Sequence, residues 1–305
     1  MDRVVTGGAD LDRVFSALVT PTRADDSIDL DVLAEIVEEQ LARGVEGFYL
    51  CGSSGEALLL SLAERREIVE RVTDQVAGRV PVVAHVGTVS TAQTIELARA
   101  AAGAGVQAVS MIPPYYYAFT SAEIERYYLD VIEAVAVPVL LYNIPQFTRV
   151  AFTKGNAAGL LGHDQVVGMK HTDHDLYSLE RLVTAFPEKV FINGFDEQYL
   201  PALVAGARAT IGTTVNIQPE LFLRVRERFA RGDVEGARRT QRQINHVVEV
   251  LVAHGVFQST KYLAAARGAV TGNCRRPFRP LDDANRVALD RLAERIRRYV
   301  ADERA

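Results

Sequence analysis

Two residues near the middle of the sequence have side chains suited to carbonyl chemistry. Lys170 follows the apolar run VVGM at 166–169, and Tyr142 opens the segment YNIP. In an apolar setting the ammonium form of a lysine is disfavoured, and the free amine attacks a carbonyl carbon to form a Schiff base. A buried phenol can relay a proton. Taken singly, each also fits a structural role, as a lysine that reaches to water or as a hydrogen-bonded core tyrosine.

The glycine-flanked segment GSSGE at 52–56 could hold a carboxylate. Backbone N–H groups at a helix start are donors for an anion, and the hydroxyls of Ser53 and Ser54 add two more. Serine is also a favoured residue at a helix N-cap. One such turn, taken alone, therefore fits a cap as well as a binding site.

Two further segments, GFDE at 194–197 and GTT at 212–214, end in polar side chains. The adjacent carboxylates of Asp196 and Glu197 can accept hydrogen bonds from a polyol, and Gly194 leaves space beside them. The hydroxyls of Thr213 and Thr214 either face the same ligand or cap the barrel. Acidic residues equally suit the first turn of a helix, so the meaning of these segments depends on whether they converge on Lys170.

The segment HTDHD at 171–175 contains residue types that bind metals. In a strand, however, successive side chains point to opposite faces. Lys170 and Thr172 then share one face while His171 lies on the other. We expect no zinc site here, and we expect His85 and the other histidines to be packed or surface residues.

Eight short runs of apolar and β-branched residues alternate along the chain with amphipathic segments of helical spacing, such as 30–43, 62–77 and 123–136. Gly105 and Gly206 fit the ends of such helices, and Ser61 and Ser121 fit their N-caps. The predicted strands span residues 14–21, 47–52, 80–87, 108–114, 137–145, 166–172, 189–196 and 207–214.

This alternation predicts parallel strands covered by helices, and eight such units close a (β/α)8 barrel. An open doubly wound sheet is the main rival, but no G-x-G-x-x-G turn follows the first strand. After Thr214 only helical patterns follow, at 221–230, 237–252 and 285–301. We therefore predict a catalytic barrel at 1–216 and a C-terminal helical extension at 217–305. In such a barrel the active site lies at the carboxyl ends of the strands, where the segments above must meet.

The composition is that of an ordinary soluble globular protein. Of the 305 residues 48% are hydrophobic and 24% are charged, and the formal net charge is -5. Lysine and arginine are spread along the chain, so we expect neither nucleic-acid binding nor a membrane patch. We find no secretory signal and no spanning segment. Cys51 and Cys274 form no C-x-x-C pair, and we expect reduced thiols in the cytoplasm.

At these motifs the sequence resembles the superfamily of dihydrodipicolinate synthase and N-acetylneuraminate lyase over nearly its whole length. GSSGE at 52–56 resembles the family's G-[ST]-[ST]-G-E loop, YNIP at 142–145 resembles its tyrosine motif, and GMK at 168–170 resembles its Schiff-base lysine segment. The stretches AHVG at 84–87 and NGFDE at 193–197 resemble the sialic acid lyase branch in particular, as do GVF at 255–257 and CRRP at 274–277.

The resemblance implies a class I aldolase that uses neither a metal nor an organic cofactor. Lys170 would be the Schiff-base nucleophile and Tyr142 the proton shuttle, while Ser53 and Ser54 would bind the carboxylate of a 2-keto acid. Tyr116 matches a family tyrosine that reaches across a subunit contact toward the neighbouring site, which implies an oligomer, usually a homotetramer. The residues expected along the path of the sugar are Thr172, Gly194, Asp196, Glu197 and Thr213.

The sequence also departs from its relatives. Phe147 stands where the synthase branch has an arginine that holds a substrate carboxylate, and Arg149 lies nearby. This favours cleavage of N-acetylneuraminate to N-acetylmannosamine and pyruvate over dihydrodipicolinate synthesis. Thr213 and Ser54 exchange the serine and threonine often seen there, and Asp173-His174 replaces a smaller pair, which leaves the exact sugar open. A related aldolase or dehydratase for a 2-keto-3-deoxy sugar acid, and a catalytically silent sugar-acid sensor, are the alternatives.

Overall fold

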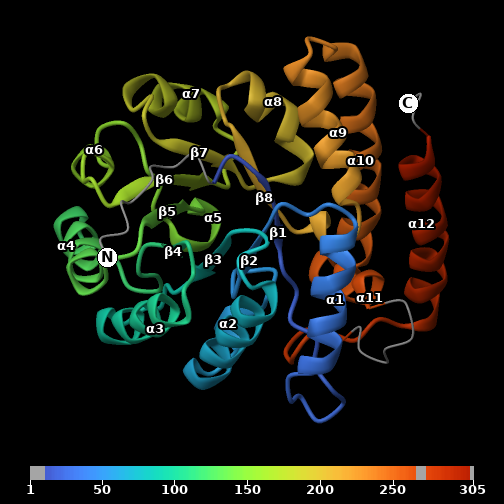
Figure 1. Cartoon of the computed structure of the whole chain (residues 1–305), viewed down its shortest axis with the longest axis horizontal. Helices are drawn as coiled ribbons and strands as arrows, with labels where there is room; N and C mark the ends of the chain where they lie inside the picture. Colours follow the sequence, from blue (N-terminus) through green and yellow to red (C-terminus); the bar gives the residue numbers. More distant parts are fainter. Residues whose placement is uncertain (1–10, 266–272, 303–305) are drawn as a thin grey trace.

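The computed structural model describes residues 11–265 and 273–302. Eight parallel strands form a closed barrel in which each strand pairs with the next along the chain and β8 pairs with β1 (Figure 1). This confirms the predicted (β/α)8 barrel. The strands are β1 (Val14–Ala17), β2 (Gly47–Leu50), β3 (Val82–His85), β4 (Ala108–Met111), β5 (Val139–Asn143), β6 (Val166–His171), β7 (Val190–Asn193) and β8 (Ala209–Gly212).

Helices surround the strands, and α10, α11 and α12 lie together on one side, beside α1 and α9 (Figure 1). The helices around the barrel are α1 (Leu30–Ala42), α2 (Leu62–Val76), α3 (Thr91–Ala104), α4 (Ser121–Ala134), α5 (Pro145–Thr148), α6 (Ala158–Leu161), α7 (Leu176–Ala185), α8 (Tyr199–Val204) and α9 (Pro219–Ala230). They are followed by α10 (Val234–His254), α11 (Val256–Ala264) and α12 (Asp283–Ala301). Short 3-10 turns occur at η2 (Ala57–Leu59), η3 (Asp196–Gln198) and η4 (Thr214–Asn216).

Most strands are shorter than the sequence pattern predicts. The run at 14–21, for example, is hydrogen-bonded as β1 only from Val14 to Ala17. The residues that follow are buried but leave the ladder for the loops above the barrel. Apolar character continues there because these loops are themselves covered, so hydrophobicity alone overstates strand length.

Helix ends follow the predicted capping chemistry with one shift. Ser61 caps α2, and its side chain accepts a hydrogen bond from the Glu64 N–H. For α4 the cap is Thr120 and not Ser121, which is already helical. Thr120 forms the capping box with Glu123 three residues later, a partner that Ser121 lacks at that spacing.

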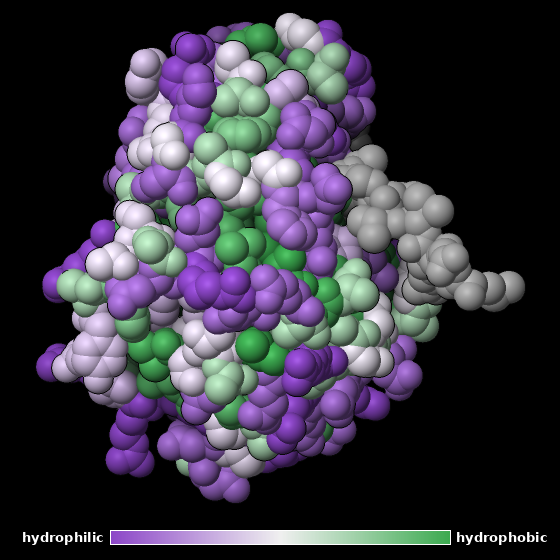
Figure 2. Space-filling model, turned by 90° about the vertical axis from the view of Figure 1, so that its left-hand side faces the viewer, coloured by the Kyte–Doolittle hydropathy of each residue, from purple (hydrophilic) through white to green (hydrophobic). Residues whose placement is uncertain are grey.

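Alternation along the strands sorts the apolar side chains into two layers. One fills the barrel interior, and the other lies between the strands and the helices. The interior set includes Phe15, Tyr49, Val83, Leu140, Tyr142 and Ile192, and the outer set includes Phe48, Val109, Leu141, Met169 and Phe191. On the face shown in Figure 2 hydrophilic residues predominate, with hydrophobic ones in small groups between them. The strands whose ends bear the candidate site residues are therefore packed on both faces by apolar side chains.

The C-terminal helices add a core of their own. Val247 and Leu251 of α10 pack with Leu289 and Ile296 of α12. Helix α9 contacts both β1 of the barrel and α10 of the C-terminal extension, so it packs against both predicted parts of the chain. The division into 1–216 and 217–305 stays a prediction. Within residues 11–265 and 273–302, no helix combines the length and the hydrophobicity of a membrane-spanning segment.

Candidate active site

Lys170 and Tyr142 lie side by side inside the carboxyl end of the barrel. Their Cα atoms are register partners on β6 and β5. The Lys170 Nζ lies 4.1 Å from the centroid of the Tyr142 ring and 4.5 Å from that of Tyr49 on β2. Only 4% of the lysine is exposed. An amine held against two ring faces in this way is shielded from water, as an imine-forming lysine must be.

A register shift in β6 decides that Lys170 faces inward. Val139 pairs with Val166, but the next residue, Leu140, pairs with Gly168, so Val167 is an extra residue on β6. Val167 points into the barrel and Met169 outward. Strict alternation from Val167 would have sent Lys170 to the outer layer. The bulge re-aims it, as bulges beside active sites often do.

Gly168 allows the strands to meet at this bulge. A Cβ atom on Gly168 would lie 1.8 Å from the carbonyl oxygen of Val190 on β7. Because that atom belongs to the backbone of a paired strand, it cannot move aside cheaply. Lys170 can therefore take its position only with a glycine at 168.

The loop at 52–56 closes over the end of β2 as a tight turn. The N–H groups of Gly55 and Ala57 donate to the Gly52 carbonyl, and the Glu56 N–H donates to the Ser53 carbonyl. The hydroxyls of Ser54 and Thr213 lie 2.7 Å apart and share a hydrogen bond. The structure thus joins this loop to the end of β8, as convergence of the motifs requires.

Asp196 is buried at the end of β7. Its Oδ2 accepts a hydrogen bond of 2.7 Å from the Thr214 N–H. A Cβ atom on Gly212 would lie 2.0 Å from its Oδ1, so glycine at 212 makes room for the carboxyl group. Burial raises the pKa of Asp196 to about 6, against the lowering effect of the Thr214 hydrogen bonds. The neighbouring Glu197 is half-buried.

Thr172 and Gly194 meet between β6 and β7. A Cβ atom on Gly194 would lie 1.8 Å from Thr172 Oγ1, so only glycine fits beside this side chain. Thr172 Oγ1 is buried and has no hydrogen-bond partner among the described residues. A buried hydroxyl without a partner is one that a ligand can satisfy.

His85 is the functional candidate that the sequence did not single out. It ends β3 inside the barrel, and its ring meets the Tyr142 ring edge-on at a centroid distance of 5.9 Å. Nδ1 lies 3.0 Å from the Cys51 carbonyl oxygen, which can only accept, and 3.5 Å from Arg65 Nη2, which can only donate. The shorter contact favours the tautomer with the hydrogen on Nδ1. Nε2 is then an acceptor, and it has no partner within the described chain. Burial and the charges of Arg65 and Lys170 lower the pKa of His85 well below its usual value.

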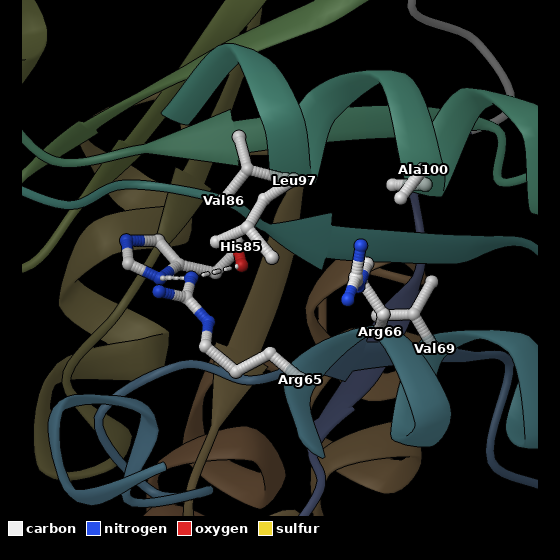
Figure 3. Close-up of a pocket in the computed structure, with 8 residues that line it drawn as sticks. Arg65, Arg66, Val69, His85, Val86, Leu97 and Ala100 are labelled. Carbon is white, nitrogen blue, oxygen red and sulfur yellow. Dashed lines mark hydrogen bonds between the residues drawn. The ribbon is translucent and has the colours of Figure 1, made fainter. Parts of the chain in front are cut away.

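Arg65 of α2 holds the end of β3 from outside the barrel. Its guanidinium is directed at His85, whereas Arg66 points away (Figure 3). Nη2 donates to the His85 carbonyl at 2.7 Å, and Nη1 donates to the Gly87 carbonyl at 3.2 Å. Period-two alternation along β3, which places Val83 and His85 on one face, is the signal that could have identified this histidine.

A cavity of about 440 Å³ opens beside Ser53. Its walls come from the loop after β2, from the ends of β3 to β5, and from the C-terminal segments. The lining residues include Ser53, Glu56, Leu58, His85, Tyr115, Ile144, Phe147, Phe257 and Phe278. Phe257 and Phe278 show that the chain after the barrel contributes to this wall.

Two other predicted features lie apart from this cluster. Tyr116 follows β4 and is 87% exposed, so its side chain does not pack on its own barrel. The imidazole of His171 faces away from Lys170, 3.2 Å from the Asn143 side chain and 3.2 Å from the Asp175 carbonyl. In the part of the chain that the structure describes, no three His, Cys, Asp or Glu side chains form a group suited to a metal ion.

Curated proteins of known activity are similar to this chain over most of its length. The N-acetylneuraminate lyase of Rhizobium meliloti (strain 1021) is 40% identical over 279 residues, which cover 92% of this chain and 93% of that protein. The N-acetylneuraminate lyase of Salmonella typhimurium is 36% identical over 288 residues, which cover 94% of this chain and 97% of that protein.

Solved structures agree with these sequences. An N-acetylneuraminate lyase from Fusobacterium nucleatum superposes with a TM-score of 0.90 at 29% identity and covers 94% of this chain and 99% of its own. A sialic acid aldolase from Ruminococcus gnavus, described as a catalytic lysine mutant, has a TM-score of 0.91 at 26% identity, with 95% and 97% covered.

The sequence pattern of the dihydrodipicolinate synthetase family matches residues 10–296. The match spans the barrel and most of the C-terminal helices, and it includes every residue of the strand-end cluster. With the barrel, the strand-end cluster around Lys170 and these relatives in agreement, the chain belongs to the dihydrodipicolinate synthetase family.

Proposed function

We propose that the protein is an N-acetylneuraminate lyase that cleaves its substrate reversibly to N-acetylmannosamine and pyruvate. The observation that carries the proposal is the Lys170 Nζ, buried 4.1 Å from the Tyr142 ring centroid at the carboxyl end of the barrel. Relatives of that activity, at 36% and 40% identity, support the choice of substrate.

In the proposed reaction the Lys170 amine adds to the C2 ketone of the substrate, and loss of water gives a protonated imine. This imine draws electrons from the C3–C4 bond. Tyr142 accepts the proton of the C4 hydroxyl as the bond breaks, so that N-acetylmannosamine leaves as an aldehyde. The pyruvate enamine that remains is protonated at C3, and water then hydrolyses the imine and restores Lys170.

The remaining residues bind and orient the substrate. Ser53 and Ser54 hold its carboxylate at the loop after β2, which places C2 toward the lysine. The hydroxyl-bearing tail of the substrate follows the ends of β6, β7 and β8. The Thr172 hydroxyl and the carboxyl groups of Asp196 and Glu197 are available there to form hydrogen bonds with it. The residues proposed along this path are Thr172, Gly194, Asp196, Glu197 and Thr213.

Reductive trapping tests the imine. The sequence contains four lysines, at positions 154, 170, 189 and 261. Borohydride added in the presence of pyruvate is expected to fix one adduct, which peptide mapping locates at Lys170. Lys170→Ala is expected to abolish it, and Lys154→Ala, a change at an exposed lysine, is the matched control. An adduct at another lysine, or none, overturns the mechanism.

A substrate panel tests the sugar. Initial rates with N-acetylneuraminate and with 2-keto-3-deoxygluconate are compared at equal concentrations. We expect the larger kcat/KM for N-acetylneuraminate, because two carboxylates line the path of its hydroxyl-rich tail. A clear preference for 2-keto-3-deoxygluconate overturns the proposed substrate and leaves the imine chemistry intact.

We also propose a homotetramer in which Tyr116 reaches the active site of a neighbouring subunit. Its 87% exposure in the single chain supports this role, because a side chain so exposed is available to a partner. Light scattering of the parent and of Tyr116→Ala measures the oligomer, and a monomeric, fully active parent overturns the proposal. The cytoplasmic location stays a prediction.

A further inference from the structure

A buried ion pair joins the loop after β2 to the C-terminal extension. Lys261 on α11 is 1% exposed and Glu56 is 6% exposed. Lys261 Nζ donates to Glu56 Oε1 at 2.7 Å. Glu56 is the last residue of the GSSGE segment, so the contact bears directly on the turn that contains Ser53 and Ser54.

The C-terminal chain surrounds this carboxylate. The Arg275 N–H donates to Glu56 Oε2 at 2.8 Å, so both carboxylate oxygens are held by residues beyond the barrel. Lys261 Nζ also donates to the Asn273 carbonyl at 2.8 Å, and Thr22 Oγ1 lies 3.5 Å away. One ammonium group thus links the loops after β1 and β2 to the segment at 273–275.

Arg275 forms a second connection from the same segment. Its guanidinium donates to the Leu59 carbonyl at 2.9 Å and to the Asp26 carbonyl at 2.6 Å, and it pairs with Glu64 of α2. The chain on the far side of Glu56 is therefore held as well. Between them, Lys261 and Arg275 hold the whole stretch from the β2 loop to the start of α2.

The backbone at Glu56 needs such support. Its φ of 56° lies in the left-handed region, which is unfavourable for a residue with a side chain. Such a conformation persists where surrounding contacts over-determine it. The Glu56 N–H closes the turn onto the Ser53 carbonyl, which couples the backbone at Glu56 to the position of Ser53.

The chemistry of the pair also argues for a positioning role. Two charges removed from water lose hydration, and a well-packed apolar pair is often as stable as a buried ion pair. What the ion pair adds is a defined direction, because two donors, Lys261 Nζ and the Arg275 N–H, each hold one oxygen of the Glu56 carboxylate. The structure places this geometry beside the cavity that Ser53 lines.

We infer that Lys261 and Glu56 are positioning residues, through which the C-terminal extension sets the conformation of the loop that binds the 2-keto acid carboxylate. The inference rests on the proposed function of that loop. Neither residue touches the reacting atoms. They act on substrate affinity through Ser53 and Ser54.

The test measures how borohydride trapping at Lys170 depends on pyruvate concentration. Lys261→Met and Glu56→Gln are expected to raise the half-saturating pyruvate concentration by about tenfold or more, since small misplacements of binding groups have large effects. Trapping at saturating pyruvate should stay at Lys170. Arg226→Met is the matched control, because Arg226 pairs with Glu46 at 2.6 Å where β2 begins, at the opposite end of the barrel.

Circular dichroism establishes that each variant is folded. Where a single change leaves an unpaired buried charge and prevents folding, the double variant Lys261→Met/Glu56→Gln decides, because it carries neither charge and keeps an acceptor for the Arg275 N–H. Folded variants with the parent's half-saturating pyruvate concentration overturn the inference, even if they melt earlier. A parent that gives no pyruvate adduct overturns the proposed function and this inference together.

Discussion

The Lys170 Nζ lies over the face of the Tyr142 ring, 4.1 Å from its centroid, so the lysine and the tyrosine are in direct contact. The contact follows from strand pairing, since the two residues are register partners on β6 and β5. The ring face stabilises a cation, and the hydroxyl lies at the edge of the same ring. The two functions of Tyr142 can therefore be separated by substitution.

Tyr142→Phe is expected to keep pyruvate trapping at Lys170 and to lower the rate of N-acetylneuraminate cleavage roughly 10²- to 10⁴-fold, because the ring stays while the proton acceptor is lost. Trapping by mass spectrometry and steady-state rates measure the two effects. Tyr49→Phe is the control. Its hydroxyl donates to Ser110 Oγ at 3.1 Å, so its loss should affect stability more than cleavage. A cleavage rate in Tyr142→Phe equal to that of the parent contradicts the role of Tyr142 as proton acceptor.

The hydrogen bond between Ser54 and Thr213 should make their substitutions non-additive. Ser54→Ala and Thr213→Val are each expected to lower kcat/KM for N-acetylneuraminate. The double variant should lose less than the sum, with a coupling energy of about 0.5–3 kcal/mol. A double-mutant cycle on kcat/KM measures this. Fully additive losses would mean that the two hydroxyls bind substrate independently of their mutual contact.

Asp196 should make stability depend on pH below neutrality. Its pKa is raised to about 6 in the folded protein from 3.8, so the unfolded chain releases this proton first as pH rises. The stabilisation is present below pH 3.8 and is lost on rising to pH 6. Relative to Asp196→Asn, the parent should lose about 2 kcal/mol of unfolding free energy between pH 4 and pH 7.

Urea unfolding of both proteins across this pH range measures the difference. Taking the difference between parent and Asp196→Asn removes the contributions of all other titrating groups. If the difference in unfolding free energy between the two proteins stays constant from pH 4 to pH 7, folding does not shift the pKa of Asp196.

Gly168→Ala should damage the barrel and the site together. Its Cβ would meet the Val190 carbonyl oxygen at 1.8 Å, so the bulge must open. We expect a loss of about 1–3 kcal/mol in unfolding free energy, with weaker pyruvate trapping as Lys170 moves. Gly103→Ala in α3 is the matched control, because its Cβ meets nothing within 4 Å. If Gly168→Ala behaves like Gly103→Ala, the bulge does not position the lysine.

Arg65→Met should destabilise the end of β3. The carbonyls of His85 and Gly87 lose their donors while buried, which we expect to cost about 2–4 kcal/mol of unfolding free energy. Arg66→Met is the neighbouring control, since Arg66 pairs with Glu96 at 3.2 Å on the surface and such pairs contribute about 0–1 kcal/mol. Urea unfolding compares the two. Equal losses of unfolding free energy in the two variants would show that the buried Arg65 stabilises the fold no more than the surface Arg66.

Local sequence patterns predicted the order of the eight strands, the helices between them and the polar side chains at the strand ends. Apolar runs and helical spacing carry this information locally, because each element buries one face of its own. The motifs around Tyr142 and Lys170 fall on consecutive strands, so parallel pairing was enough to predict that they meet.

Packing between elements, in contrast, sets which residues face the interior and which distant groups are partners. The bulge at Val167 and Gly168 turns Lys170 inward, and it arises from pairing with β5 and close contact with β7. Glu56 and Lys261 are 205 residues apart in sequence, and no local pattern relates them. The sequence likewise contains His85, but nothing in it indicates that the His85 ring contacts the Tyr142 ring. Register and burial of single side chains follow from packing between elements, which local periodicity does not encode.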